Sequence, residues 1–155
     1  MVRVWIFSFV LLVGILSHAA WSAEKNPAPV QVGSDNFYRF LNEVYYGKNK
    51  DSYIGKTFEV TGMVFHDTNN FYANQAYVGR YLMMCCNADA MVAGFYIQGD
   101  KLGSFKKETW VKVRGKIEKK ATPQGQVAVI LFDSIAKTGE EAPYIVPSLD
   151  ETLTR

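Results

Sequence analysis

Apolar residues recur along this chain in two different rhythms, and the change between them separates a helical part from a longer β-rich part. Near the start they are spaced by three and four, with Ser34 ahead as an N-cap and Gly47 behind as a stop. This pattern predicts a helix over Asp35–Tyr46. Its apolar stripe consists of Phe37, Phe40, Leu41, Val44 and Tyr45. We interpret the stripe as core packing.

From Thr57 onward the period becomes two, which is typical of β-strands. The pattern predicts five strands, at Thr57–Phe65, Tyr77–Cys86, Val92–Gln98, Trp110–Glu118 and Val127–Ala136. Polar loops at Asp67–Ala76 and Lys119–Gln126 separate two pairs of them, and Asn87–Met91 favours one helical turn. Gly62 inside the first strand indicates a bulge or a sharp bend.

Five short strands with no long helix between them predict a mainly β fold. With the glycine in the first strand and a helical turn near the middle, they fit a small five-stranded OB-like Greek-key barrel preceded by one amphipathic helix. That helix would cover one open end of the barrel. A two-sheet sandwich built from the same strands is the alternative that the pattern leaves open.

The first residues are typical of a secretory signal peptide at 1–22. Arg3 is followed by an apolar run over Val4–Leu16, and Ala20-Trp21-Ser22 offers small residues for a cut before Ala23. An uncleaved anchor is the alternative, since about 20 apolar residues can span a bilayer. We therefore expect an extracytoplasmic protein, periplasmic or secreted, that is tethered if the signal stays uncleaved.

The remaining chain is long enough for one domain. We expect a flexible linker at 23–33, rich in proline, an OB-like domain at 34–147 and a tail at 148–155. The formal net charge of +2 is too small to indicate a polyanionic partner, so nucleic acid is not expected. The sequence contains no phosphate loop, nucleophile elbow or paired-histidine motif, which favours a non-enzymatic role.

The candidate chemistry lies in Arg80–Ala90, which holds both cysteines of the chain, Cys85 and Cys86, side by side. Neighbouring Cα atoms are about 3.8 Å apart, whereas ordinary disulfides span roughly 4.4–6.8 Å. A bond between these two sulfurs would be strained and would close no loop. A stabilising disulfide within the chain is therefore excluded.

The hairpin register sets a second constraint. If His66 faces Tyr77, then Phe58 faces Cys85, which places Cys85 on the apolar side and points Cys86 outward. His66 would then lie eight residues from Phe58, or about 26 Å at about 3.3 Å per residue. It is a poor candidate to share a metal with the cysteines.

If the backbone turns at Cys86, then Cys85, Cys86 and Asp89 converge as a two-sulfur, one-oxygen metal site for a thiophilic ion such as zinc. No fourth ligand is identifiable. In the alternative interpretation Cys85 is a small buried residue and Asn87 or Asp89 caps the turn. Redox exchange is a third interpretation, and the absence of Cys-x-x-Cys spacing disfavours it.

Two further residues are candidates for binding. Arg80 is expected to join the basic residues of the fourth predicted strand in a patch, although outward-facing charges commonly serve solubility alone. Tyr144 lies between Pro143 and Pro147 and is a candidate docking point, with packing against the barrel as the alternative.

Several segments together resemble the C-terminal domain of the YcgQ-like bacterial family of uncharacterised proteins. The specific segment is Cys85-Cys86-Asn87-Ala88-Asp89-Ala90, a Cys-Cys-x-Ala-Asp-Ala signature. The supporting segments are Tyr53–Lys56, Val60–Gly62, Trp110–Gly115 and Pro143–Ile145, with Arg80 beside the signature. The resemblance covers roughly Phe37 to Val146.

This resemblance implies an OB-like domain that is the extracytoplasmic partner of a membrane permease, because such proteins are usually encoded beside a YcgR-like permease. The family offers no established catalytic residues to carry over. Typical members have membrane spans before the domain, whereas this chain has one signal-like segment.

Overall fold

The structure of the protein is a computed structural model that describes residues 27–66, 74–122 and 125–147. The expected signal peptide and tail lie outside these residues. In chain order the elements are β1 (Val30–Val32), α1 (Phe37–Tyr45), η1 (Lys50–Tyr53), β2 (Thr57–Phe65), β3 (Gln75–Leu82), η2 (Asn87–Asp89), β4 (Met91–Gln98), η3 (Leu102–Ser104), β5 (Trp110–Thr122), β6 (Gly125–Lys137) and β7 (Tyr144–Ile145). None of the helices within the described ranges has the length and apolar character that a membrane crossing needs.

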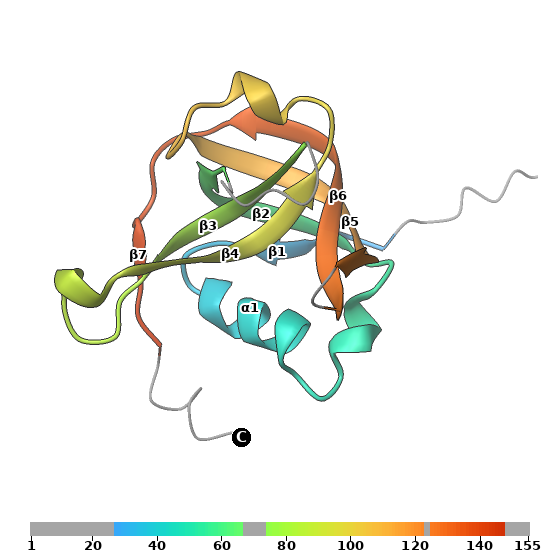
Figure 1. Ribbon diagram of the computed structural model, residues 1–155, viewed down its shortest axis with the longest axis horizontal. Helices are drawn as coiled ribbons and strands as arrows, with labels where there is room; N and C mark the ends of the chain where they lie inside the picture. Colours follow the sequence, from blue (N-terminus) through green and yellow to red (C-terminus); the bar gives the residue numbers. More distant parts are fainter. Residues whose placement is uncertain (1–26, 67–73, 123–124, 148–155) are drawn as a thin grey trace, which may run out of the picture.

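Five strands hydrogen-bond to one another in a closed ring, in the order β2, β5, β6, β4, β3 and back to β2 (Figure 1). β4 and β6 run parallel, and the other neighbours in the ring run antiparallel. Two short strands flank the ring, since β1 pairs parallel to β2 and β7 pairs parallel to β3. The prediction of a mainly β protein with one leading helix is confirmed.

The flanking strands were not foreseen. β1 lies inside the segment expected to be a flexible linker, and β7 lies in the stretch before the tail, where no strand was predicted. Two or three residues carry no readable periodicity, and these strands exist because β2 and β3 offer them an edge. β5 and β6 are each 13 residues long, so they take up most of the predicted Lys119–Gln126 loop.

The helix begins at Phe37, two residues later than predicted. Asn36, rather than Ser34, occupies the N-cap position. The Asn36 side chain accepts a hydrogen bond from the Gly33 backbone N–H and donates one to the Gln31 carbonyl, both at 3.0 Å. These bonds hold the entry to α1 against β1.

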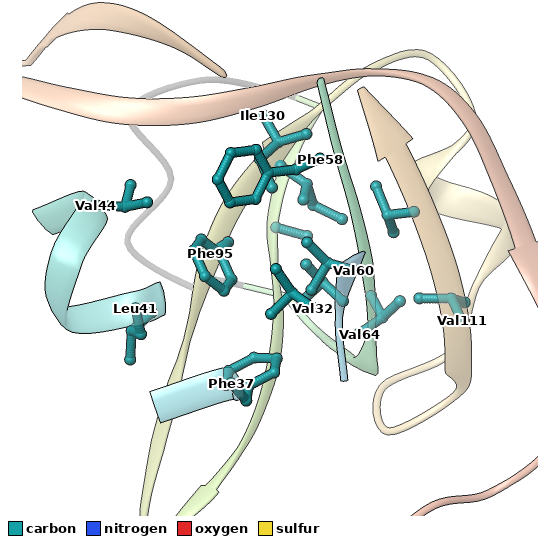
Figure 2. Close-up of a cluster of buried hydrophobic side chains, with 14 of the residues drawn as sticks. Val32, Phe37, Leu41, Val44, Phe58, Val60, Val64, Phe95, Val111 and Ile130 are labelled. Atoms are coloured by element: carbon teal, nitrogen blue, oxygen red, sulfur yellow. The ribbon is translucent and has the colours of Figure 1, made fainter. Parts of the chain in front are cut away.

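The core forms where α1 meets the ring (Figure 2). Phe37 packs edge-to-face on Phe95 of β4 at 5.4 Å, and Phe40 packs on Phe58 of β2 at 6.0 Å. The most deeply buried apolar side chains in this cluster are Phe37, Phe58, Val60, Val64, Ala76, Val78, Phe95, Ile97, Val111, Val113, Ile117 and Ile130. The predicted apolar stripe of the helix therefore packs in the core, as expected.

The backbones come unusually close where β2, β3 and β4 pair side by side. A Cβ atom on Gly79 would lie 2.7 Å from the Ala93 carbonyl oxygen, and one on Gly62 would lie 2.9 Å from the Gly79 carbonyl oxygen. Only glycine permits this approach. The expected bulge is not at Gly62, because the β2–β5 register runs through it unbroken. The register shift lies instead in the β5–β6 pairing, between Arg114 and Gly115.

Candidate functional site

The two cysteines lie at the tip of the β3–β4 hairpin, which projects away from the ring (Figure 1). The last strand pair is Leu82 with Met91, and residues 83–90 form the turn between them. β7 runs beside β3, and just past the end of β3 the Met83 backbone N–H donates to the Ile145 carbonyl at 3.0 Å. The hairpin base is therefore held on both sides, and the tip extends beyond it. We call residues 83–90 the hairpin tip.

Asp89 shapes the hairpin tip. One carboxylate oxygen accepts the Met84 backbone N–H at 3.2 Å, and the other accepts the Cys85 backbone N–H at 2.8 Å. The Asp89 backbone N–H donates to the Cys86 carbonyl at 3.1 Å, which closes the single turn of η2. The expected helical turn after the cysteines is thus present, and the carboxylate holds the chain that leads into it.

Cys85 and Cys86 are both free and exposed. Their sulfur atoms are 3.9 Å apart, too far for a disulfide bond and close enough for contact. Cys86 itself is extended, with φ −158° and ψ 171°, and the turn starts at the next residue. The two sulfurs nevertheless lie near one another.

The predicted position of Cys85 is wrong. β3 ends at Leu82, four residues before the predicted end, and the observed β2–β3 register pairs Val64 with Val78 rather than with Gly79. The pairing covers only three residue pairs, and Phe58 faces Gly115 of β5 instead of Cys85. Cys85 therefore projects into solvent, which also removes the interpretation of Cys85 as a small buried core residue.

The surroundings give the two thiols different acidity. The Asp89 carboxylate, which accepts a hydrogen bond from the Cys85 thiol, raises the pKa of Cys85 above its ordinary value. A hydrogen bond from the Ala88 backbone N–H and one from the Cys85 thiol lower the pKa of Cys86. The pKa of Asp89 is lowered, first by its bond from the Cys85 thiol. Cys86 is the more acidic thiol of the pair.

The sulfur separation matches the demands of a shared metal ion. Metal–sulfur bonds of zinc are about 2.3 Å long, so an ion bound by both sulfurs at 3.9 Å would see an S–metal–S angle of about 116°. This angle lies between those of tetrahedral and trigonal centres.

The predicted three-ligand set is only partly assembled. Across residues 27–66, 74–122 and 125–147, no three His, Cys, Asp or Glu side chains form a group that could hold a metal ion. The Cys85 and Cys86 sulfur atoms contact each other, whereas the two Asp89 carboxylate oxygens accept the backbone N–H groups of Met84 and Cys85. His66 lies elsewhere, with Nε2 2.8 Å from the Phe105 carbonyl oxygen.

Arg80 does not belong to an exposed basic patch, and this prediction is wrong. Its side chain is fully buried. The guanidinium donates to the carbonyls of Thr61 at 3.0 Å and Ala142 at 2.5 Å, and it forms an ion pair with Glu141 at 2.5 Å. It also lies 4.9 Å from the Trp110 ring centre. The charge ties the segment before β7 to the ring and has no free face for a ligand.

Tyr144 packs against β3 and is also partly exposed. It packs against Tyr81, with ring centres 5.7 Å apart, and remains 41% exposed. Other large apolar side chains are exposed close by in the chain or across the strand pairs, namely Met84, Met91, Val92 and Val146. These residues come from three separate segments, and the pairing of β3 with β4 and with β7 brings them together, so local periodicity does not reveal the group.

A cavity between α1, η1 and the β5–β6 hairpin is not a competing site. It is lined by Tyr45, Asp51 and Lys119 among others, and its volume is about 70 Å³. Small-molecule sites usually have about 300–1,000 Å³. A cavity of this size has room for a few waters at most.

The described residues therefore define a mainly β domain with an exposed thiol pair at the tip of a hairpin. The chain belongs to the DUF1980 C-terminal domain family, whose family model matches residues 17–147. This match confirms that the chain belongs to an uncharacterised family. No curated protein matches the chain.

Among solved structures, the chain is similar to a small single-stranded DNA-binding protein from Streptomyces coelicolor. The two chains share 12% identity with a TM-score of 0.30, over 54% of this chain and 94% of the other. A likeness of this size carries no inference about function.

Proposed function

We propose that this protein is an exported, non-enzymatic accessory domain that assists a membrane permease and binds a thiophilic metal ion, such as zinc, through Cys85 and Cys86. The observation that carries the metal site is the pair of free, exposed sulfur atoms 3.9 Å apart at the hairpin tip. Asp89 acts as a positioning residue, because its carboxylate holds the backbone N–H groups of Met84 and Cys85. The remaining ligands come from solvent, a small thiol or the partner.

Exposure supports a binding role over a structural one. Cysteine is among the residues most often buried, and two adjacent exposed thiols add nothing to a packed core. The two sulfurs are 3.9 Å apart, a separation that one ion could bridge, which supports binding with little rearrangement.

The metal proposal is tested by titrating the reduced protein with Zn²⁺ and, separately, with Ag⁺. We expect one equivalent of ion to protect both thiols from a thiol reagent, and Cys86→Ser to weaken binding at least about tenfold. Ser104→Ala, on the exposed η3 turn, is the control variant. If neither ion protects the thiols of the unmodified protein, the metal site does not exist.

The permease partner is proposed from the resemblance to the YcgQ-like family, whose members are usually encoded beside a YcgR-like permease. The exposed Tyr144 offers a contact point at the hairpin base. Co-expression of the chain with the neighbouring permease should allow both to be purified together from detergent-solubilised membranes, and Tyr144→Ala should reduce the yield of the complex. Recovery of the chain without the permease would contradict the assignment.

The extracytoplasmic location is proposed from the sequence of residues 1–22. Cell fractionation should place the protein outside the cytoplasm, and mass spectrometry of its N-terminus should begin at Ala23 if the signal is cut. An intact N-terminus in a cytosolic fraction would overturn this proposal.

A pure protein-interaction module is the second candidate, favoured by the exposed apolar residues around the hairpin tip. Under this alternative the thiols bind no ion, and Cys86→Ser leaves the complex with the permease unchanged. The titration and the co-purification together separate the two candidates.

We further propose that the ring is an OB-like Greek-key barrel. Numbered in chain order, the ring strands β5, β2, β3 and β4 are the fourth, first, second and third, which is the Greek-key order. β6, the fifth, closes the ring between β4 and β5. α1 packs against Phe95 of β4 and Phe58 of β2, which fits a helix that covers one end of the ring. An experimental structure in which β4 and β6 are not neighbours would contradict this fold.

A further inference from the structure

Sulfur is concentrated at the hairpin tip to an unusual degree. After the predicted signal peptide the chain contains four methionines and two cysteines, and five of these six residues fall between positions 83 and 91. The sixth, Met63, is buried in a separate cluster with Phe65 and Trp110. The fold therefore uses Met63 for packing, and the other five sulfur-containing residues are close to one another in the chain.

Two of these methionines are left open to solvent. Met84 is 60% exposed and Met91 is 59% exposed. Met84 directly precedes Cys85, and Met91 pairs with Leu82 at the base of the hairpin tip. Methionine ordinarily fills gaps in a core, so exposed thioethers on both flanks of two exposed thiols need another explanation.

The hairpin tip offers few hard ligands. The Asp89 carboxylate already accepts two backbone N–H groups, and His66 is at the opposite end of β2, beside Phe105. Structural zinc sites are almost always four-coordinate, with nitrogen, sulfur or oxygen ligands supplied by the protein. Thiolate and thioether ligands instead favour Cu(I), which is satisfied by fewer, softer donors.

We propose that the thiol pair takes a monovalent soft ion, Cu(I), in an all-sulfur site completed by the thioether of Met84 or Met91. This inference rests on the proposed function, since it names the ion class of the same site. Asp89 stays outside the coordination shell and positions the backbone of the turn.

The test compares Ag⁺, a redox-inert probe for Cu(I), with Zn²⁺ on the full reduced chain. Affinities are measured by competition against a chelator, and stoichiometry by native mass spectrometry. We expect the double variant Met84→Leu/Met91→Leu to bind Ag⁺ at least about tenfold more weakly, with Zn²⁺ affinity unchanged. The single variants then show which thioether is the ligand.

Leucine has nearly the volume of methionine, so the variants should fold, and thermal unfolding checks this. Met63→Leu is the matched control and should leave both affinities unchanged. If the double variant retains its Ag⁺ affinity, or loses Zn²⁺ affinity to the same extent, the all-sulfur site is wrong while the thiol pair can still bind metal. If the unmodified chain binds neither ion, the proposed function fails together with it.

Discussion

Strand β3 and the hairpin tip that follows it use polar chemistry in opposite ways. At Arg80 a charge is fully buried, and its guanidinium is bonded to Thr61, Glu141 and Ala142. Five residues later, at the hairpin tip, Cys85 and Cys86 face solvent. The comparison shows that a charged side chain does not by itself mark a binding site. The Arg80 charge stabilises the fold, whereas the two thiols remain accessible to ligands.

The largest effect should come from breaking the buried region. Arg80→Met removes three hydrogen bonds and leaves the Thr61 carbonyl buried without its partner. We expect a loss of about 3–5 kcal/mol in the free energy of unfolding, measured in urea. Arg114→Met, on the exposed face of β5, should change it by less than about 0.5 kcal/mol. Equal effects of the two variants would show that Arg80 is not an internal tie.

The close approach of β2, β3 and β4 at Gly79 should be the next most sensitive point. In Gly79→Ala the new Cβ would meet the Ala93 carbonyl oxygen at 2.7 Å, so backbone must move. We expect a loss of about 1–3 kcal/mol in unfolding free energy. Gly103→Ala, with nothing within 4 Å of its Cβ position, should be neutral or slightly stabilising. A tolerated alanine at position 79 would mean that the backbones of β3 and β4 are less closely packed there than described.

Two neighbouring tyrosines sharpen the contrast between buried and exposed positions. The Tyr45 hydroxyl donates to the Ala128 carbonyl at 3.1 Å and accepts the Tyr96 backbone N–H at 3.0 Å. Tyr45→Phe should cost about 1–3 kcal/mol in thermal or urea unfolding, because it leaves both groups without that partner. Tyr46, 79% exposed, is the control, and Tyr46→Phe should have almost no effect.

The buried hydroxyl of Tyr45 should also make the free energy of unfolding depend on pH. Burial raises the pKa of Tyr45 well above its ordinary value of 10.0. Its contribution to stability is therefore complete below about pH 10 and is lost as pH rises toward the folded-state pKa. The decline of unfolding free energy above pH 10 should be shallower in Tyr45→Phe than in the unmodified protein. Identical slopes would contradict a protonated buried hydroxyl.

The smallest effect is expected within the hairpin tip itself. Because the pKa of Cys86 is lowered and that of Cys85 is raised, Cys86 should react several-fold faster with iodoacetamide near neutral pH. The rates are separated with Cys85→Ser and Cys86→Ser. Asp89→Asn should raise the rate of Cys85, since it removes the carboxylate that accepts the thiol proton. A faster Cys85 in the unmodified protein would reverse the assignment.

Periodicity alone determined most of the fold. The spacing of Phe37, Leu41 and Val44 predicted the helix and its buried face, and two-residue alternation located all five ring strands. Such patterns are local, because each side chain only has to face the core or the solvent. The Cys-Cys-x-Ala-Asp-Ala segment was likewise visible, and the turn after it was anticipated.

Tertiary structure decided the register and the exposure. A one-residue slip between β2 and β3, and the early end of β3 at Leu82, moved Cys85 from the apolar side to solvent. Arg80 became a buried tie only because the segment around Glu141 folds back onto it. Contacts between residues that are distant in the sequence cannot be predicted from local hydrophobic periodicity. The residue types alone therefore indicated the candidate polar and thiol groups, and only the packing of the strands decided which of them are accessible to solvent.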